Sequence, residues 1–345
     1  MDENPQDDTE QILSDLLRGA MRALAARAMA ELRLADALDV PGTAQEVAER
    51  IDVDPSTLQR LLLALASLRL VTVQDGVFTL TPAGQRLRSD VPGSDWGGIM
   101  MMASPWTLAT WSGLPESVRT GQPAFERVHG QSFWDYLRSN DEAGRIFDAA
   151  MARGSRDRDP TALLHAELAT YDARTIVDVG GGTGRLLSQA VAALPGVRGV
   201  LADQEATIAQ APKVFEDHGV ADRCEAVVCD FFEAVPSGDV FLLSNILHDW
   251  DDQRCRTILD RVREAAVDGA RLVVIETVLP DETNGVSPES APLHLLDLTM
   301  LLNFGARERT LAEYAGLLEA AGFGDVRQVG DTGRCLVVAR AGAAG

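Results

Sequence analysis

The sequence predicts an α/β protein in which a doubly wound, mostly parallel sheet follows a mostly helical N-terminal region. From residue 166 onward, short runs rich in Val and Ile alternate with helical patterns. That alternation is typical of parallel sheets with helices on both faces. Nearer the N-terminus, two short helical patterns precede a hairpin pattern, the order found in a winged helix-turn-helix. A chain of 345 residues has room for about two domains.

Residues 1–95 are expected to form the N-terminal domain. Its first helix is apolar around much of its circumference, which predicts burial against another surface, such as a second subunit. Thr43 precedes Glu46 by three residues, the spacing of a capping box at a helix start. The expected elements are helices over 11–39, 43–51 and 56–70 and strands over 70–73 and 77–81.

Residues 96–165 are expected to connect this domain to the sheet. The stretch from 92 to 123 is rich in Trp and Met and is predicted to be irregular, whereas 133–152 has a helical pattern. Residues 153–160 are polar and charged, as in a linker.

The C-terminal domain is expected to span residues 166–345. Its last two strands surround a Gly-containing turn at 330–333 and form a strand pair. The predicted strands are 175–179, 198–202, 224–228, 240–246, 271–277, 325–329 and 334–339, and the predicted helices are 184–193 and 252–266.

Composition argues against several classes of partner. The chain has 52 acidic and 31 basic residues, a net charge of −21, which disfavours nucleic acid and anionic membranes. No run approaches the roughly 20 apolar residues of a membrane helix, and the acidic start is unlike a signal peptide. No two of the four cysteines have C-x-x-C spacing, so we expect reduced thiols in a cytoplasmic protein.

The strongest local motif is Asp178-Val-Gly-Gly-Gly-Thr-Gly184, at the junction of the first strand and helix of the sheet. Adjacent glycines let a ligand approach the backbone, and a helix N-terminus favours anionic groups. Asp203, at the end of the next strand, could accept hydrogen bonds from ribose hydroxyls. The pattern predicts a nucleoside-containing cofactor, although a tight turn without a ligand remains the alternative. The motif does not match G-x-G-x-x-G cleanly, yet a nicotinamide-dependent oxidoreductase stays open.

His248 follows the fourth strand and should therefore lie beside the cofactor crevice. A side chain with its near-neutral pKa suits removal of a proton from a hydroxyl. Asp251 or Asp252, shortly after it in the chain, is interpreted as the cap of the following helix, because a metal site is a weaker reading of such an acidic run. Asp230-Phe231-Phe232, after the third strand, could contact an adenine ring, although a loop acid beside core aromatics is the simpler reading.

The sequence resembles the S-adenosylmethionine-dependent O-methyltransferases that include plant caffeate-type enzymes and bacterial polyketide and antibiotic tailoring enzymes. The similarity covers nearly the whole chain and rests on four motifs in the family's order. These are residues 178–184, 230–232, 247–252 (Leu-His-Asp-Trp-Asp-Asp) and 305–310 (Gly-Ala-Arg-Glu-Arg-Thr). Ala306 departs from the second Gly that relatives often have. The resemblance implies a Rossmann-like class I methyltransferase domain behind a winged-helix dimerisation domain, and hence a homodimer.

The resemblance also implies roles for particular residues. His248 would be the general base, oriented by Glu276 and Glu308, with no metal ion. The cofactor S-adenosylmethionine would be bound by Asp178, Gly180, Gly182, Gly184, Asp203, Asp230, Phe231 and Ser244. A planar acceptor, a phenol of an aromatic or polyketide-type small molecule, would contact Trp106, Phe133, Trp134, Phe147, Met151, Met300, Asn303 and Phe304.

Other functions remain open. Relatives have drifted to hydroxylation, decarboxylation or pericyclic chemistry, but those hydroxylases lose the His that this chain keeps as His248. Transfer to nitrogen or carbon is a further alternative. A winged-helix DNA-binding regulator is disfavoured, because its would-be recognition helix carries only Arg60 and Arg69 among Leu and Ala.

Overall fold

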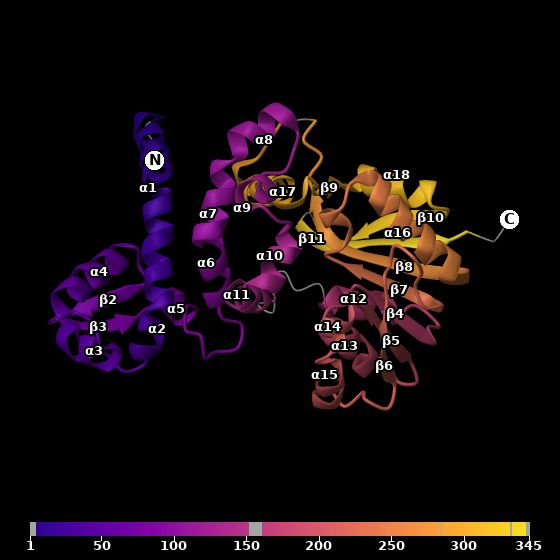
Figure 1. The fold of residues 1–345 in the computed structure, drawn as a ribbon, viewed down its shortest axis with the longest axis horizontal. Helices are drawn as coiled ribbons and strands as arrows, with labels where there is room; N and C mark the ends of the chain where they lie inside the picture. Colours follow the sequence, from indigo (N-terminus) through magenta and orange to yellow (C-terminus); the bar gives the residue numbers. More distant parts are fainter. Residues whose placement is uncertain (1–4, 152–160, 284, 332, 343–345) are drawn as a thin grey trace. The chain divides into compact units, whose positions relative to one another are not determined.

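The computed structural model describes residues 5–151, 161–283, 285–331 and 333–342 (Figure 1). Its contacts divide the chain into two compact units: unit 1 is Met1–Leu114 with Phe125–Asp157, and unit 2 is Pro115–Ala124 with Arg158–Gly345. The linker expected at 153–160 lies outside the described residues. The division of the chain at residues 95 and 165 stays a prediction.

The first part of unit 1 has the expected helix, helix and hairpin order. The helix expected over 11–39 is wrong as a single element: Arg33 has a left-handed backbone, φ 53°, which ends one helix and starts another. Thr43 and Glu46 form the predicted capping box. A three-stranded sheet has the order β1-β3-β2. The elements are α1 (Pro5–Glu31), α2 (Leu34–Ala37), β1 (Gly42–Thr43), α3 (Ala44–Ile51), α4 (Pro55–Ser67), β2 (Val71–Gln74) and β3 (Val77–Leu80).

The remainder of unit 1 is helical, and so the prediction of an irregular segment over 92–123 is wrong. Its helices are short, and apolar periodicity does not follow burial in them: α7 buries Thr107 and Thr110 but leaves Leu108 38% exposed. The helix expected over 133–152 is two helices, because the backbone of Asn140 is extended. The elements are α5 (Pro82–Gln85), α6 (Trp96–Met102), α7 (Pro105–Ser112), α8 (Leu114–Thr120, mostly in unit 2), α9 (Phe125–His129), α10 (Phe133–Ser139) and α11 (Asp141–Met151).

Unit 2 is built on an eight-stranded sheet with the order β10-β11-β8-β7-β4-β5-β6, and β9 pairs with β8 outside this path. The strands β8, β7, β4, β5 and β6 run parallel, whereas β10 and β11 are antiparallel additions at one edge. The strands are β4 (Thr175–Val179), β5 (Arg198–Asp203), β6 (Cys224–Val228), β7 (Gly238–Ser244), β8 (Ala266–Leu279), β9 (Arg309–Thr310), β10 (Phe323–Val329) and β11 (Gly333–Ala341).

Helices cover both faces of this sheet (Figure 1). Apolar residues of α16 and α18 pack on one face, and those of α12, α13 and α15 on the other. This arrangement confirms the predicted doubly wound α/β fold. The helices are α12 (Thr161–Leu168), α13 (Arg185–Ala193), α14 (Glu205–Ile208), α15 (Ala211–Asp217), η1 (Leu247–Asp249), α16 (Asp252–Ala265), η2 (Pro288–Ser290), α17 (Ala291–Phe304) and α18 (Leu311–Ala320).

The parallel strands bring the predicted chemistry to one edge of the sheet. Asp203 is the last residue of β5, and the glycine loop and His248 follow the carboxyl ends of β4 and β7, where ligands bind in open α/β sheets. Within the described residues, none of the helices combines the length and apolar character that crossing a membrane requires.

Candidate active site

The loop after β4 has a backbone shape that favours glycine. Gly180, Gly182 and Gly184 have positive φ angles of 69°, 65° and 82°. A Cβ on Gly180 would lie 2.4 Å from Cδ1 of Ile246, and one on Gly184 would lie 2.8 Å from Cε1 of Phe215. The loop therefore keeps its backbone close to the neighbouring strands, and a ligand above it can contact peptide groups directly.

Two carboxylates hold the underside of this loop. Asp203 accepts a hydrogen bond from the backbone N–H of Gly182, N···O 2.8 Å. Asp178 is fully buried directly against Gly181, and its carboxylate has no hydrogen-bond partner in the described part of the chain. Burial, together with the charge of Asp203, raises the pKa of Asp178 to about 7. An unpaired buried carboxylate here is a binding point for a donor or a positive group.

The predicted adenine-binding residues lie beside the same loop. The carboxylate of Asp230 accepts the backbone N–H of Phe232, N···O 2.9 Å. The Phe231 ring would lie 3.5 Å from a Cβ on Gly180. Phe232 in turn makes an edge contact with Trp250, with ring centroids 4.9 Å apart. These aromatic contacts link the adenine-side loop to the segment that carries His248.

His248 lies in η1, between three carboxylates. Its Nδ1 is 2.9 Å from Oε1 of Glu308 and 3.4 Å from Oε2 of Glu276. Its Nε2 is 3.5 Å from Oδ1 of Asp249. Glu276 and Glu308 are buried, 0% and 2% exposed. The structure therefore brings together the three residues that the sequence suggested for catalysis.

The electrostatics of this cluster favour a protonated imidazole in the free protein. Burial acts to lower the pKa of His248, but the carboxylates, Glu276 foremost, outweigh burial and raise that pKa to about 10. Burial raises the pKa of the Asp249 carboxyl to about 7 and also raises the pKa of Glu276. The titrations of His248, Asp249 and Glu276 are coupled, because the charge of each shifts the pKa of the others.

Arg309 fixes the segment that carries His248. This guanidinium is fully buried and donates to the carbonyl oxygens of Leu247 and Trp250, N···O 3.0 and 2.9 Å. It also pairs with Asp252 at 2.8 Å. Because Arg309 directly follows Glu308, it ties the loop of His248 to the backbone of its carboxylate partner.

Other polar contacts complete the support. Oε1 of Glu276 accepts the backbone N–H groups of both Ile246 and Leu247 at 2.8 Å. Asp297 of α17 accepts the backbone N–H of Glu308, also at 2.8 Å. The carboxylate of Glu276 and the backbone of Glu308 are therefore each held by a contact that does not involve the imidazole.

Sequence reasoning assigned no role to Asp249, Asp297 or Arg309. Asp249 and Arg309 lie inside the motifs at 247–252 and 305–310, so their position could have indicated a role in the site. Asp297 lies outside these motifs, in an otherwise apolar helical stretch. Asp251 is confirmed as a helix cap, since it accepts the backbone N–H of Arg254 at 2.8 Å. Asp252 instead pairs with Arg309.

His248, Glu276 and Glu308 also offer ligand atoms within 4.8 Å of one another. One imidazole and two carboxylates could hold a divalent cation. In this structure, however, Oε1 of Glu276 already accepts two N–H groups and Oε1 of Glu308 contacts His248. The contacts are those of an ion pair, and the expected metal-free site stays a prediction.

The expected substrate residues fall into both units. In unit 1, Phe133 makes edge contacts with Trp106, Trp134 and Phe147, with ring centroids 5.2 to 6.2 Å apart. Phe133 is 4% exposed and is a core residue, whereas Met151, at the end of α11, is 50% exposed. In unit 2, the last turns of α17 carry Met300, Asn303 and Phe304, and this helix packs against η1. Their common role in binding an acceptor stays a prediction.

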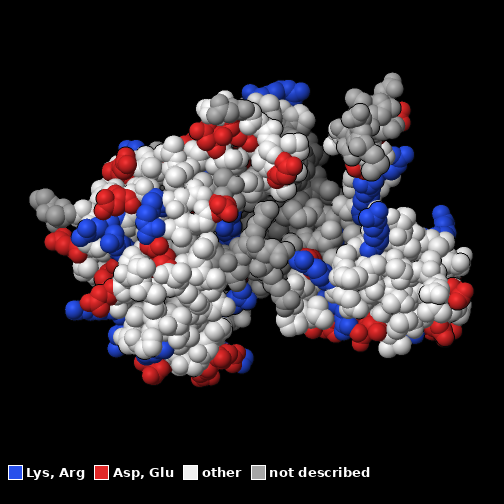
Figure 2. Space-filling model, turned by 180° about the vertical axis from the view of Figure 1, so that it is seen from behind, with Lys and Arg blue, Asp and Glu red and all other residues white. Residues whose placement is uncertain are grey.

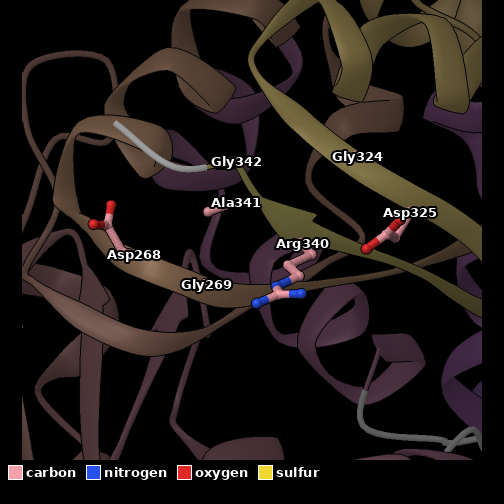
Figure 3. A pocket seen from close by; sticks show the side chains of 7 residues that line it. All are labelled: Asp268, Gly269, Gly324, Asp325, Arg340, Ala341 and Gly342. Carbon is pink, nitrogen blue, oxygen red and sulfur yellow. The ribbon is translucent and has the colours of Figure 1, made fainter. Parts of the chain in front are cut away.

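A separate hollow of about 370 Å³ lies at the other end of β8 (Figure 3). Gly269 in its wall is seven residues before Glu276 along the strand, about 23 Å away. The hollow therefore belongs to neither the glycine loop nor the His248 cluster. Its walls are Asp268, Gly269, Gly324, Asp325, Arg340, Ala341 and Gly342.

Comparison with known proteins decides the family. A model of the O-methyltransferase domain matches residues 111–324, and a model of the O-methyltransferase dimerisation domain matches residues 14–90. The chain belongs to the O-methyltransferase family. This match confirms the resemblance noted in the sequence, and with it the enzyme class: an S-adenosylmethionine-dependent O-methyltransferase.

Relatives of this O-methyltransferase span nearly its whole length. It is 39% identical over 306 residues to the O-demethylpuromycin-O-methyltransferase of Streptomyces alboniger, covering 86% of this chain and 80% of the relative. It is 36% identical over 303 residues to the 8-amino-8-demethylriboflavin N,N-dimethyltransferase of Streptomyces davaonensis, covering 86% and 85%. A crystal structure of a calicheamicin-biosynthesis methyltransferase in its S-adenosylhomocysteine-bound form superposes with a TM-score of 0.80 at 30% identity, covering 99% and 100%.

We predict that Arg309→Lys lowers the free energy of unfolding of this O-methyltransferase by roughly 1–3 kcal/mol, because buried carbonyls lose donors. Arg307→Lys is the matched control: Arg307 is half exposed and pairs with Glu313 at the surface, so the change should stay within about 0.5 kcal/mol. Urea unfolding of the three proteins measures both effects. Equal stability of the Arg309→Lys variant and the wild type would show that Arg309 does not hold the loop.

Proposed function

We propose that this enzyme transfers a methyl group from S-adenosylmethionine to a hydroxyl of an aromatic small molecule, with His248 as general base and without a metal ion. The observation that carries the proposal is that the imidazole of His248, after the end of β7, is held by Glu276 and Glu308. The neighbouring strand of β7 is β4, which the glycine loop follows. A hydroxyl above this edge would have both a proton acceptor and a bound cofactor within reach.

The residues around the glycine loop fit the cofactor. Because the loop glycines have positive φ angles and no Cβ atoms, the methionine part of the cofactor can approach the backbone closely. The unpaired carboxylate of Asp178 can accept a hydrogen bond from the ammonium group of the cofactor. Asp203 would bind the ribose, and Asp230 with Phe231 the adenine. When bound, S-adenosylmethionine supplies an electrophilic methyl group on a positively charged sulfur. The S-adenosylhomocysteine bound in the calicheamicin methyltransferase supports this cofactor.

His248 must be neutral to accept a proton. With a pKa of about 10 it is protonated at neutral pH in the free protein. A positive charge close to the cluster disfavours imidazolium and lowers that pKa. Glu308 holds Nδ1, and Nε2, which lies 3.5 Å from Oδ1 of Asp249, is the nitrogen that would receive the proton of the acceptor hydroxyl. Because a phenol has a pKa near 10, removal of its proton during attack gives a better nucleophile.

We propose that the enzyme is a homodimer formed through its N-terminal region. The match to the dimerisation domain supports this, and so does an apolar surface along α1 that is exposed in a single chain. Such a surface is the mark of a subunit interface. The exposed apolar residues of this face are Ile12, Leu13, Leu16, Leu17 and Met21, between 52% and 76% exposed.

We do not propose nucleic acid or membrane as a partner. The second helix of the winged-helix pattern, α4, carries a single basic residue, Arg60. Acidic and basic side chains are interspersed on the face seen in Figure 2, and the net charge is −21. Such a surface does not favour a polyanion. The four free thiols support a reducing, cytoplasmic location.

Transfer to an aromatic amine is a second candidate. The observation that favours it is the relative named as an N,N-dimethyltransferase of an aminoriboflavin, which is 36% identical to this chain. A panel of hydroxyaryl and aminoaryl acceptors with labelled S-adenosylmethionine separates the two, because the labelled product is an ether or an amine.

We predict that His248→Gln lowers turnover by about 10²–10⁴-fold, the usual contribution of a general base. The affinity for S-adenosylhomocysteine, measured by calorimetry, should stay unchanged. His218→Gln, at the C-terminal cap of α15, where Nδ1 contacts the carbonyl oxygen of Val214, is the control and should retain wild-type turnover. Undiminished methylation by the His248→Gln variant would remove His248 from the base role.

We predict that Leu17→Asp shifts the enzyme to a monomer, because a charge placed on the α1 face is buried on association at a cost. Val118→Asp replaces an equally exposed apolar residue, 70% against 76%, on α8 and should leave the dimer intact. Light scattering at micromolar concentration reports the mass. A monomeric wild-type protein, or a dimeric Leu17→Asp variant, would contradict the proposed interface.

A further inference from the structure

Arg334 brings a positive charge to the carboxyl end of β7. It is the second residue of β11, opposite Thr277 of β8, and its guanidinium reaches across β8 to the next strand. There it donates to the hydroxyl oxygen of Ser244, N···O 3.2 Å. A residue of the antiparallel strand β11 thus reaches the carboxyl ends of the parallel strands, where the site is built.

Register places this guanidinium next to the glycine loop. Asp178 of β4 pairs with Leu242 of β7, so two residues further along Gly180 lies level with Ser244. Ile246 confirms the proximity, since its side chain would meet a Cβ on Gly180 at 2.4 Å. Ser244 and Leu242 share one face of β7 because they are two residues apart, and Asp178 lies opposite Leu242 on that face. Arg334 and the unpaired carboxylate of Asp178 therefore flank the same part of the loop.

The order of the strands gives the cofactor a direction, if the proposed function holds. Asp203 ends β5 and Asp230 follows β6, on one side of β4, whereas His248 follows β7 on the other side. The adenosine part then lies over β5 and β6, and the reacting methyl group lies near His248. The amino-acid end of the cofactor is left with the region between β4 and β7.

That end is a zwitterion, and the site has acidic groups in excess. Asp178, Asp203, Glu276 and Glu308 would attract its ammonium group and repel its carboxylate. A carboxylate is stable here only with a cationic partner, for which a guanidinium beside a hydroxyl is well suited. We infer that Arg334, with the Ser244 hydroxyl, binds the α-carboxylate of S-adenosylmethionine while Asp178 receives the ammonium group.

Among the described residues next to the glycine loop, Arg185 is a competing cation. It opens α13 directly after Gly184, where the helix N-terminus also favours a negative charge. Arg185, however, follows Gly184, the last glycine of the loop. Arg334 instead contacts Ser244 of β7, which lies level with Gly180, the first glycine. The two arginines therefore give a matched pair of variants.

The test compares two ligands that differ in the amino-acid part. S-adenosylhomocysteine carries it, whereas 5′-methylthioadenosine keeps the adenosine and thioether but lacks the amino acid. Calorimetry with the full-length enzyme measures both ligands against wild type, Arg334→Gln, Arg334→Lys and Arg185→Gln. We expect Arg334→Gln to weaken S-adenosylhomocysteine by roughly 10- to 100-fold, as for a hydrogen bond to a charged group, and 5′-methylthioadenosine by less than about twofold. Arg334→Lys should restore part of the loss, and Arg185→Gln should change neither ligand.

Three outcomes would overturn the assignment. Unchanged binding of S-adenosylhomocysteine by Arg334→Gln would exclude the contact, and an equal loss of both ligands would show that Arg334 only shapes the fold. If Arg185→Gln weakened S-adenosylhomocysteine selectively and Arg334→Gln bound it like the wild type, the carboxylate would be bound at the start of α13 instead. Failure of the wild type to bind S-adenosylhomocysteine would instead contradict the proposed function, so the two failures are distinguishable.

Discussion

A charged imidazole buried among carboxylates is the constraint on which the rest of this site depends. His248 can stay charged in a buried place only because Glu308 and Glu276 are fixed 2.9 and 3.4 Å from its Nδ1. Burying those carboxylates costs free energy in turn. The backbone N–H groups of Ile246 and Leu247 donate hydrogen bonds to Glu276 and so stabilise its charge. Arg309 then fixes the loop so that the partners cannot separate. The end of β7, the end of β8 and the strand β9 are held in one arrangement by this chain of contacts.

A second group of acids gives the loop after β4 its character. Asp178 is buried without a partner, and Asp203 supports the loop from the next strand. Together with the cluster around His248 they make this edge of the sheet negative, which suits a cofactor with a cationic sulfur and an ammonium group. The same negative field repels the carboxylate of the cofactor, which therefore needs a cationic partner. We infer that this partner is the guanidinium of Arg334. Charge therefore connects cofactor binding to the protonation state of the base.

Sequence patterns predicted the sheet well because its buried strands are continuous runs of Val, Ile and Leu between glycine-containing turns. They failed for α6, α7 and α8, where short helices bury Thr107 and Thr110 and periodicity carries little information. Residues that act through local motifs, such as Asp178 to Gly184 and His248, could be found from sequence. Arg309 could not be given a role, because its partners lie about sixty residues away and meet it only after β8 and β9 pair. Arg334 was invisible for the same reason, since it reaches Ser244 across β8.

The most direct test of this account is the pKa of His248, followed by NMR of its imidazole carbon-bound protons, with the signal assigned by its loss in a variant lacking this histidine. S-adenosylhomocysteine and S-adenosylmethionine share every group except the methyl that makes the sulfur positive. We expect a pKa well above 7 in the free and S-adenosylhomocysteine-bound enzyme, because carboxylates stabilise imidazolium, and a clearly lower pKa with S-adenosylmethionine. A pKa near 6.5 in the free enzyme, or the same pKa with both ligands, would contradict the account.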